Sequence, residues 1–290
     1  MTFSGRLSQP SIIILDGATG SELEARGVKT LLPLWSTVAL LSREGRETLR
    51  SIHCDYIRAG AEIITANTFR TNYRVLKKES MESRASELTR IAVDEVRFAH
   101  EESKVTSPVF IAGSVAPVED CYSPELVPPN EDLLDEHRRH IDNLYNSGVD
   151  IVLIETMNTI REAVIALEYA KQTELPVLVS FICKDPEHLL SGESLEKAVE
   201  RCALLKPAVI LINCVEVNLM EKNLEALRSL TRLPIGGYAN VLKKGYTTEF
   251  DITPQDFAKR VKEWIDRFQL KVVGGCCGTT PKHIQCLSEI

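Results

Sequence analysis

Short apolar runs alternate with longer amphipathic stretches along the whole chain. Eight of these runs are continuous and rich in Ile and Val, which is typical of strands buried on both faces. They are Ser11–Leu15, Glu62–Ala66, Val109–Ala112, Asp150–Ile154, Pro176–Phe181, Ala208–Asn213, Pro234–Ala239 and Lys271–Gly275. Helical periodicity is clearest in Glu82–Glu102, Asp132–Ser147, Leu219–Leu230 and Pro254–Phe268.

This alternation predicts the fold. Eight strand–helix units favour an α/β protein of the closed (β/α)8, TIM-barrel type, and a chain of 290 residues is long enough for one. An open doubly wound sheet is the alternative if some units are miscounted. No linker rich in Pro, Gly or Ser interrupts the chain, so we expect a single domain over residues 1–290. The proline-rich segment Val115–Asn130, which contains Cys121, is expected to be a loop on the active-site face, where a lid would lie.

Composition narrows the range of partners and compartments. The formal net charge is -7 and no stretch is densely basic, so we expect no nucleic-acid partner. The N-terminus has no signal-peptide pattern, and no apolar run approaches the ~20 residues that cross a bilayer. We therefore expect a cytoplasmic protein without a membrane partner, in which the eight cysteines are thiols or ligands. The oligomeric state is not determined by the sequence.

Polar residues follow several of the predicted strands directly. In a barrel these strand ends converge on one mouth, where catalysis takes place. Glu155 ends a buried run and requires a cationic partner, which the amino group of a substrate would supply. Asp16 and Thr68 occupy equivalent positions, although each is also explained as a local cap. The glycines after Asp16 do not match a phosphate-binding loop, so nucleotide binding is not expected.

Three cysteines stand at the ends of two predicted strands. Cys214 follows the sixth run, and Cys276 and Cys277 follow the eighth, where neighbouring glycines allow the chain to bend. Three thiolates select zinc over magnesium or calcium, and an open fourth position is typical of a catalytic zinc. The alternative is a group of packed thiols without a metal.

Four motifs together resemble the homocysteine S-methyltransferase family. They are Asp16-Gly17-Ala18-Thr19-Gly20-Ser21-Glu22-Leu23, Ala66-Asn67-Thr68-Phe69, Asn213-Cys214 and Gly274-Gly275-Cys276-Cys277-Gly278. The resemblance runs in order from about Ile12 to Ile284. It implies a (β/α)8 barrel, Zn2+ held by Cys214, Cys276 and Cys277, and homocysteine as the methyl acceptor.

The resemblance also implies roles for the substrate-binding residues. Asp16 and Glu155 would bind the amino group of homocysteine, and Thr68 would face its carboxylate together with the Gly17 and Ala18 backbone. Asn213, which belongs to the cysteine motif, is included among the predicted substrate-binding residues.

The methyl donor follows less directly from the resemblance. The compact length and Leu34-Trp35-Ser36 are similar to free-standing members that use S-methylmethionine or S-adenosylmethionine. The loop Ala116–Tyr122 departs from the loop of S-methylmethionine users. We predict a role in methionine biosynthesis, with S-methylmethionine as first donor and S-adenosylmethionine as second. The alternatives are a corrinoid, folate or betaine donor, a thiol redox protein, or a non-catalytic zinc- or thiol-binding protein.

Overall fold

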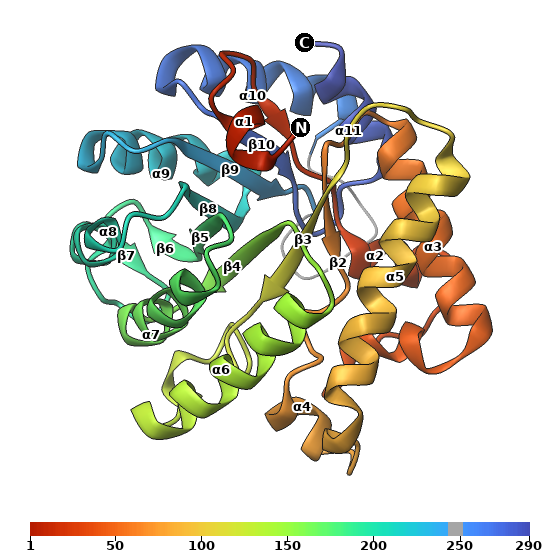
Figure 1. Cartoon of the computed structure of the whole chain (residues 1–290). Helices are drawn as coiled ribbons and strands as arrows, with labels where there is room; N and C mark the ends of the chain where they lie inside the picture. Colours follow the sequence, from red (N-terminus) through yellow and green to blue (C-terminus); the bar gives the residue numbers. More distant parts are fainter. Residues whose placement is uncertain (243–251) are drawn as a thin grey trace.

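The computed structural model describes residues 1–242 and 252–290. Eight parallel strands form a central sheet, and helices surround it (Figure 1). Their order around the sheet is β1-β10-β9-β8-β5-β4-β3-β2. The bounds are β1 Ile13–Ile14, β2 Ile63–Ala66, β3 Phe110–Val115, β4 Ile151–Met157, β5 Val177–Phe181, β8 Val209–Glu216, β9 Ile235–Asn240 and β10 Val272–Gly275.

The two ends of this strand order meet and close the sheet. Leu15 and Ile63 form a parallel bridge next to β1 and β2. The amide of Asp16 donates to the carbonyl of Ile63 at 3.0 Å, and that of Glu62 donates to Ile14 at 2.8 Å. The predicted (β/α)8 barrel is therefore confirmed, and the open doubly wound sheet is wrong.

The helices occupy the predicted intervals. The α-helices of the described residues are α1 Phe3–Leu7, α2 Thr19–Ala25, α3 Arg43–Arg58, α4 Tyr73–Lys77, α5 Ala85–Ser103, α6 Asn130–Asn146, α7 Ile160–Ala170, α8 Leu195–Leu204, α9 Val217–Leu230, α10 Pro254–Phe268 and α11 Pro281–Ser288. The predicted bounds of α10 are confirmed, and the Thr253 side chain caps this helix by accepting from the amide of Asp256. No helix of the described residues is both long and apolar enough to span a membrane.

Three strands continue three residues past the ends that the sequence predicts. β3 runs on to Val115, β4 to Met157 and β8 to Glu216. The β8–β9 register shifts between Asn213 and Glu216, and Cys214 has φ +56°, so β8 contains a bulge where the apolar run alone indicates an end. A small hairpin, β6 Cys183–Asp185 and β7 His188–Leu189, follows β5 and was not predicted. Within the predicted loop after β3, Pro124–Leu126 forms a 3-10 turn.

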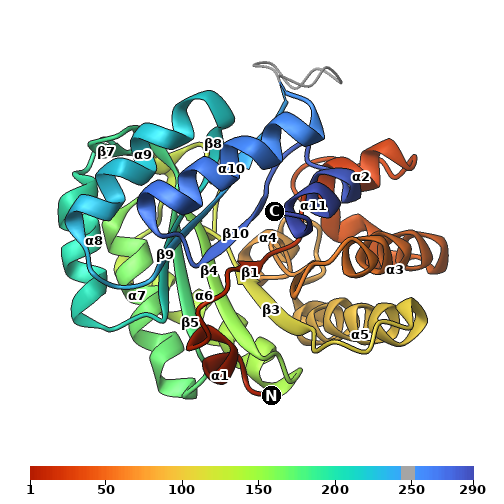
Figure 2. The ribbon, with the colours of Figure 1, turned by 90° about the horizontal axis from the view of Figure 1, so that it is seen from above.

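Alternating strand residues point into the barrel or outward to the helices. The lower part of the interior is an apolar floor, whose buried residues are Phe3, Ile13, Leu15, Ile63, Phe110, Ala112, Ile151, Leu153, Leu178, Val209, Leu211, Tyr238 and Val272. Phe3 brings α1 against this floor, where its ring meets that of Phe110 edge-on at 5.4 Å. Figure 2 shows α1 at one end of the barrel.

The same period of two places polar side chains above the floor. Continuing two residues from Leu153 reaches Glu155, and continuing two from Leu211 reaches Asn213. We call this set the polar layer; it comprises Thr65, Ser114, Glu155, Ser180 and Asn213. It lies towards the carboxyl ends of the strands, where barrel enzymes carry their active sites.

Candidate functional site

A cavity of about 470 Å3 opens at the carboxyl ends of the strands, above the polar layer. This volume suits a small-molecule site. Seven of the nine residues predicted to bind substrate or metal line the cavity: Asp16, Gly17, Ala18, Glu155, Cys214, Cys276 and Cys277. Residues from opposite ends of the sequence therefore converge here, as the strand-end argument predicts.

The three predicted cysteine ligands form one cluster. Their Sγ atoms all lie within 4.8 Å of one another, and Cys214 Sγ is 2.9 Å from Cys276 Sγ. Asn240, at the end of β9, links the ends of the two neighbouring strands, β8 and β10. Its Nδ2 donates to the carbonyl of Cys214 at 3.0 Å, and its Oδ1 accepts from the amide of Cys277 at 3.1 Å.

The three thiols of the cluster interact with one another, and this shifts their pKa values in different directions. Hydrogen bonding with Cys276 and Cys277 raises the pKa of the Cys214 thiol well above its ordinary value. Hydrogen bonds from Cys214 and Cys276 hold the pKa of Cys277 well below its ordinary value. A tetrahedral zinc with Zn–S bonds of about 2.3 Å separates its sulfur atoms by about 3.8 Å, which lies within the spread of this cluster. The donor set and its spacing therefore fit zinc.

Two buried carboxyl groups face the same cavity. Asp16 accepts from the amide of Thr65 at 2.8 Å and from its hydroxyl at 2.9 Å. Glu155 accepts from Ser114 Oγ at 2.5 Å and from the Tyr238 hydroxyl at 3.1 Å. Burial raises the pKa of Asp16 to about 7. Burial also raises the pKa of Glu155, although the hydrogen bonds from Ser114 and Tyr238 act to lower it.

Neither carboxyl group forms an ion pair with a described residue. A buried carboxylate without a counter-ion is costly, and the raised pKa values reflect that cost. A positively charged ligand beside these carboxylates would remove this energetic cost. Asp16 does not cap the following helix, because the N-cap of α2 is Ala18. The alternative interpretation of Asp16 as a helix cap is therefore wrong.

The sequence of the chain matches a known protein family over nearly its whole length. The sequence profile described as homocysteine S-methyltransferase matches residues 13–290. The chain belongs to the homocysteine S-methyltransferase family. It is an enzyme of that family, and the resemblance seen in the sequence motifs is confirmed.

Characterised relatives cover nearly the whole chain. Homocysteine S-methyltransferase 3 of Zea mays is 29% identical over 95% of this chain and 88% of its own length. Selenocysteine methyltransferase of Astragalus bisulcatus is 27% identical over 96% of this chain and 91% of its own. The metallated form of the homocysteine methyltransferase MmuM from Escherichia coli has a TM-score of 0.85 and 26% identity, covering 99% of this chain and 98% of that one.

Two of the predicted substrate-binding residues do not line the cavity of this family member. The Thr68 hydroxyl accepts from the amide of Ser114 at 2.9 Å and donates to its carbonyl at 3.0 Å. Thr68 is fully buried, and it fastens the end of β2 to β3. The prediction that Thr68 faces a substrate carboxylate is corrected for its side chain, because both hydroxyl functions are used within the protein.

Asn213 is the second correction. It is fully buried, and its side chain bonds twice to Thr156: Oδ1 accepts from the Thr156 amide at 3.0 Å, and Nδ2 donates to the hydroxyl at 2.8 Å. Ser180 Oγ also donates to Asn213 Oδ1 at 2.6 Å. Thr156 and Cys214 both have positive φ, +60° and +56°, in bulged strands. Asn213 therefore joins two strained strand ends and positions their neighbours Glu155 and Cys214.

The loop containing Gly17 and Ala18 lies close against the side chains of Tyr56 and Thr279. A Cβ on Gly17 would lie 2.7 Å from the Tyr56 hydroxyl and 2.8 Å from Thr279 Oγ1, so only glycine fits there. The amide of Ala18 donates to Thr279 Oγ1 at 3.2 Å. The first loop of the family motif is thus fixed against the segment that follows the two adjacent cysteines.

Sequence reasoning missed several residues of the cavity wall. Trp35 and Phe69 pack edge-on at 5.4 Å, and Tyr122 and Arg70 line the same cavity. The signal was present for Phe69 and Arg70, which directly follow Thr68 at a strand end. Cys121 also lines the cavity, and burial raises the pKa of its thiol to about 12, so it is a neutral wall residue near pH 7.

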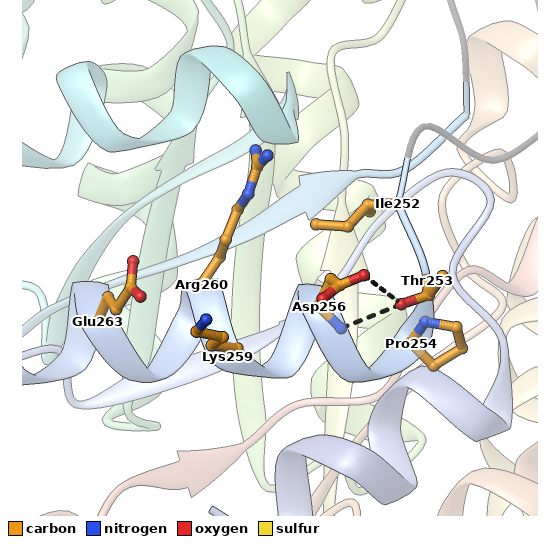
Figure 3. Close-up of a pocket in the computed structure, with 7 residues that line it drawn as sticks. All are labelled: Ile252, Thr253, Pro254, Asp256, Lys259, Arg260 and Glu263. Carbon is orange, nitrogen blue, oxygen red and sulfur yellow. Dashed lines mark hydrogen bonds between the residues drawn. The ribbon is translucent and has the colours of Figure 1, made fainter.

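A second hollow, of about 620 Å3, lies along α10 and is a poorer candidate. Figure 3 shows its lining residues, Ile252, Thr253, Pro254, Asp256, Lys259, Arg260 and Glu263. Asp256 and Thr253 bond to each other as part of the helix cap. Among the described residues, the lining contains no thiol and no buried carboxyl group, so this part of the hollow offers no comparable chemistry.

Proposed function

We propose that the protein transfers a methyl group from a sulfonium donor to the sulfur of homocysteine, which becomes methionine. S-methylmethionine is the favoured donor and S-adenosylmethionine the second, and Cys214, Cys276 and Cys277 hold the zinc. The observation that carries the proposal is that three clustered sulfur atoms and two unpaired, buried carboxyl groups face one cavity.

Cys214, Cys276 and Cys277 would hold zinc, which would supply an open position for the acceptor sulfur and favour its ionised, nucleophilic form. The chain holds this centre through Asn240, which ties β8 to β10, and through Asn213, which fixes the bulge at Cys214. The thiol proton of the acceptor passes to water before the transfer, and no general base is needed at the methyl carbon because no carbon–hydrogen bond breaks.

The two carboxyl groups orient the acceptor. Its ammonium group supplies the counter-charge that Asp16 and Glu155 lack, and its binding would return both pKa values towards their ordinary range. Such positioning is the larger part of catalysis, because alignment of the two sulfur atoms with the methyl group can supply roughly 7–11 kcal/mol.

The cavity wall suits a cationic donor. Trp35, Phe69 and Tyr122 present aromatic rings, which attract sulfonium groups as they attract other cations. The donor loses its positive charge on transfer, so a cavity with little water favours the reaction. With S-methylmethionine, the carbon–sulfur bond of the donor breaks, one methionine forms from the donor and another from the acceptor.

The test is methionine formation by zinc-loaded, reduced protein given homocysteine and, in parallel, each sulfonium. We expect turnover with at least one of them. No turnover with either, from protein that retains one zinc per chain, would favour a corrinoid, folate or betaine donor. Protein that retains no zinc after reconstitution would contradict the assignment of the three cysteines.

A further inference from the structure

Arg70 has an uncommon environment for a buried arginine. It follows β2, is only 6% exposed and lines the cavity. Its Nη1 donates to the carbonyl of Glu119 at 3.1 Å, and its Cζ lies 5.6 Å from the centre of the Phe69 ring. Its Nε is buried and has no hydrogen-bond partner among the described residues. A permanently charged group therefore faces a cavity with part of its donor capacity unused.

The side chain of Glu119, the residue whose carbonyl Arg70 contacts, does not neutralise this charge. The Glu119 side chain is bound by Arg74 Nε at 2.5 Å and by Lys78 Nζ at 2.6 Å, so only its carbonyl is left for Arg70. Arg6 provides the contrast. It is similarly buried, at 8% exposed, but it bonds to both carboxylate oxygens of Glu62 at 2.6 and 2.8 Å. A buried guanidinium without such a partner is costly unless a ligand supplies the anion.

We propose that Arg70 binds the carboxylate of the methyl donor and so selects donors that are amino acids. This inference rests on the proposed function and specifies its donor. Guanidinium binds carboxylate through parallel N–H donors, which matches an Nε that has no partner.

The resemblance assigns the carboxylate of the acceptor to the Gly17 and Ala18 backbone, which leaves the carboxylate of the donor for Arg70. β2 lies diametrically across the barrel from β8, which carries Cys214, and two strands from β10, which precedes Cys276 and Cys277. In-line transfer places the donor sulfur beyond the methyl group, on the side away from the acceptor sulfur and its cysteine ligands. The donor's carboxylate thus extends towards the β2 side. The carbon chain of the amino acid separates the sulfonium, at the aromatic rings, from the guanidinium that would repel it.

The experiment combines a change in the enzyme with the matching change in the donor. Arg70→Gln keeps an N–H donor for the Glu119 carbonyl and removes the charge. The probes are S-methylmethionine and its decarboxylated analogue, (3-aminopropyl)dimethylsulfonium. In the wild type we expect kcat/KM to fall about 10- to 100-fold when the carboxylate is removed, as for a lost charge-assisted hydrogen bond.

In Arg70→Gln we expect the same fall with S-methylmethionine, an unchanged KM for homocysteine, and no further loss with the decarboxylated donor. Arg70→Lys, which keeps the charge but not the planar geometry, should recover part of the loss. Arg139→Gln is the matched control, since Arg139 packs over the Tyr73 ring and lines no part of the cavity. Its donor KM should equal that of the wild type.

Three outcomes would overturn the inference. The first is a wild-type enzyme that uses both donors equally, a result that needs no variant to fold. The second is an Arg70→Gln enzyme whose KM rises for homocysteine instead of the donor. The third is a wild type that neither binds nor uses any sulfonium, which removes the proposed function as well. In the first two outcomes methyl transfer from a sulfonium survives, so the two failures are distinguishable.

Discussion

The apolar floor and the polar layer of the barrel both lie in the interior, but their burial has opposite energetic consequences. Leu153 and Glu155 stand two residues apart on β4 and point into the same interior, 1% and 8% exposed. Burial of Leu153 stabilises the fold through the hydrophobic effect, whereas burial of Glu155 raises its pKa and costs stability. The same strand period therefore builds the core at one level and the site at the next.

The difference also shows how the site is prepared for ligands. In the polar layer, hydroxyl and amide groups are used up on one another: Ser180 bonds to Asn213, and Ser114 bonds to Glu155. The hydrogen-bonding groups of this layer have partners, but the charge of Glu155 has no counter-ion among the described residues. The floor is complete without a ligand, and the polar layer becomes complete only with a cation.

We expect the largest effect when one sulfur ligand is removed from the three-cysteine cluster. Cys214→Ser replaces a soft donor with a hydroxyl in the three-sulfur cluster. We expect the variant to lose both zinc retention and turnover, while the barrel still folds. Metal content per chain, circular dichroism and methionine formation measure the three properties.

Cys202→Ala is the matched control for this experiment. Cys202 is a fully buried thiol on α8 and lies outside the cavity. The control should keep its zinc and its turnover and lose only a little stability. Equal loss of zinc in both variants would show that metal retention depends on the fold as a whole and not on Cys214.

A cavity in the floor should have the next largest effect. Leu153→Ala removes buried methyl groups and should lower the free energy of unfolding by roughly 2–5 kcal/mol. The KM for homocysteine should remain close to that of the wild type at a temperature where the variant is folded. A changed KM with unchanged stability would show that Leu153 serves the site and not the core, which would contradict the distinction between the apolar floor and the polar layer.

The pH dependence of stability tests Asp16. Its folded pKa of about 7 lies above its ordinary value of 3.8, so its contribution to stability is complete below that lower value and is lost as the pH rises through 7. Between about pH 5 and pH 8, the ligand-free wild type should lose roughly 3 kcal/mol relative to Asp16→Asn. Urea unfolding at several pH values measures this difference, and parallel curves for the two proteins would contradict the raised pKa.

Glu155→Gln should have the smallest free-energy effect and the most specific one. The substitution keeps the shape and lets the Ser114 and Tyr238 hydroxyls remain bonded, but it removes the charge that binds the acceptor ammonium. We expect homocysteine to bind roughly 10- to 100-fold more weakly, with full zinc content. Calorimetric titration measures this, and normal homocysteine binding would refute the assignment of Glu155 to the amino group.

The fold was predictable because its signals are local. Each strand contains a short run that is mostly apolar, and Thr253-Pro254 marks the start of α10 as the structure has it. The end of β8 was not predictable, because the bulge at Cys214 depends on the side chain of Asn213 reaching Thr156 on another strand. The hairpin β6–β7 is too short to stand out from the loop that contains it.

The site was predictable where chemistry alone identifies a residue. Three cysteines at two strand ends, and carboxyl groups directly after apolar runs, are rare enough to be informative. Thr68 and Asn213 share the same motifs, yet their side chains satisfy buried partners, and only the packed structure reveals that. Arg70 was overlooked because an arginine in a polar segment normally lies at the surface; its burial and the prior pairing of Glu119 distinguish it.

The separation of the cysteines in sequence has a consequence for the synthesis of the protein. Cys214 and Cys276 lie 62 residues apart, and β10, the strand that precedes Cys276 and Cys277, is also the one that pairs with β1. A nascent chain that has reached only β9 therefore carries a single thiol of the cluster and an unclosed barrel. The three-sulfur site therefore forms in the same step in which β10 pairs with β1 and closes the barrel. Metal binding by a newly synthesised chain would thus indicate that β10 has been translated and has paired with its neighbouring strands.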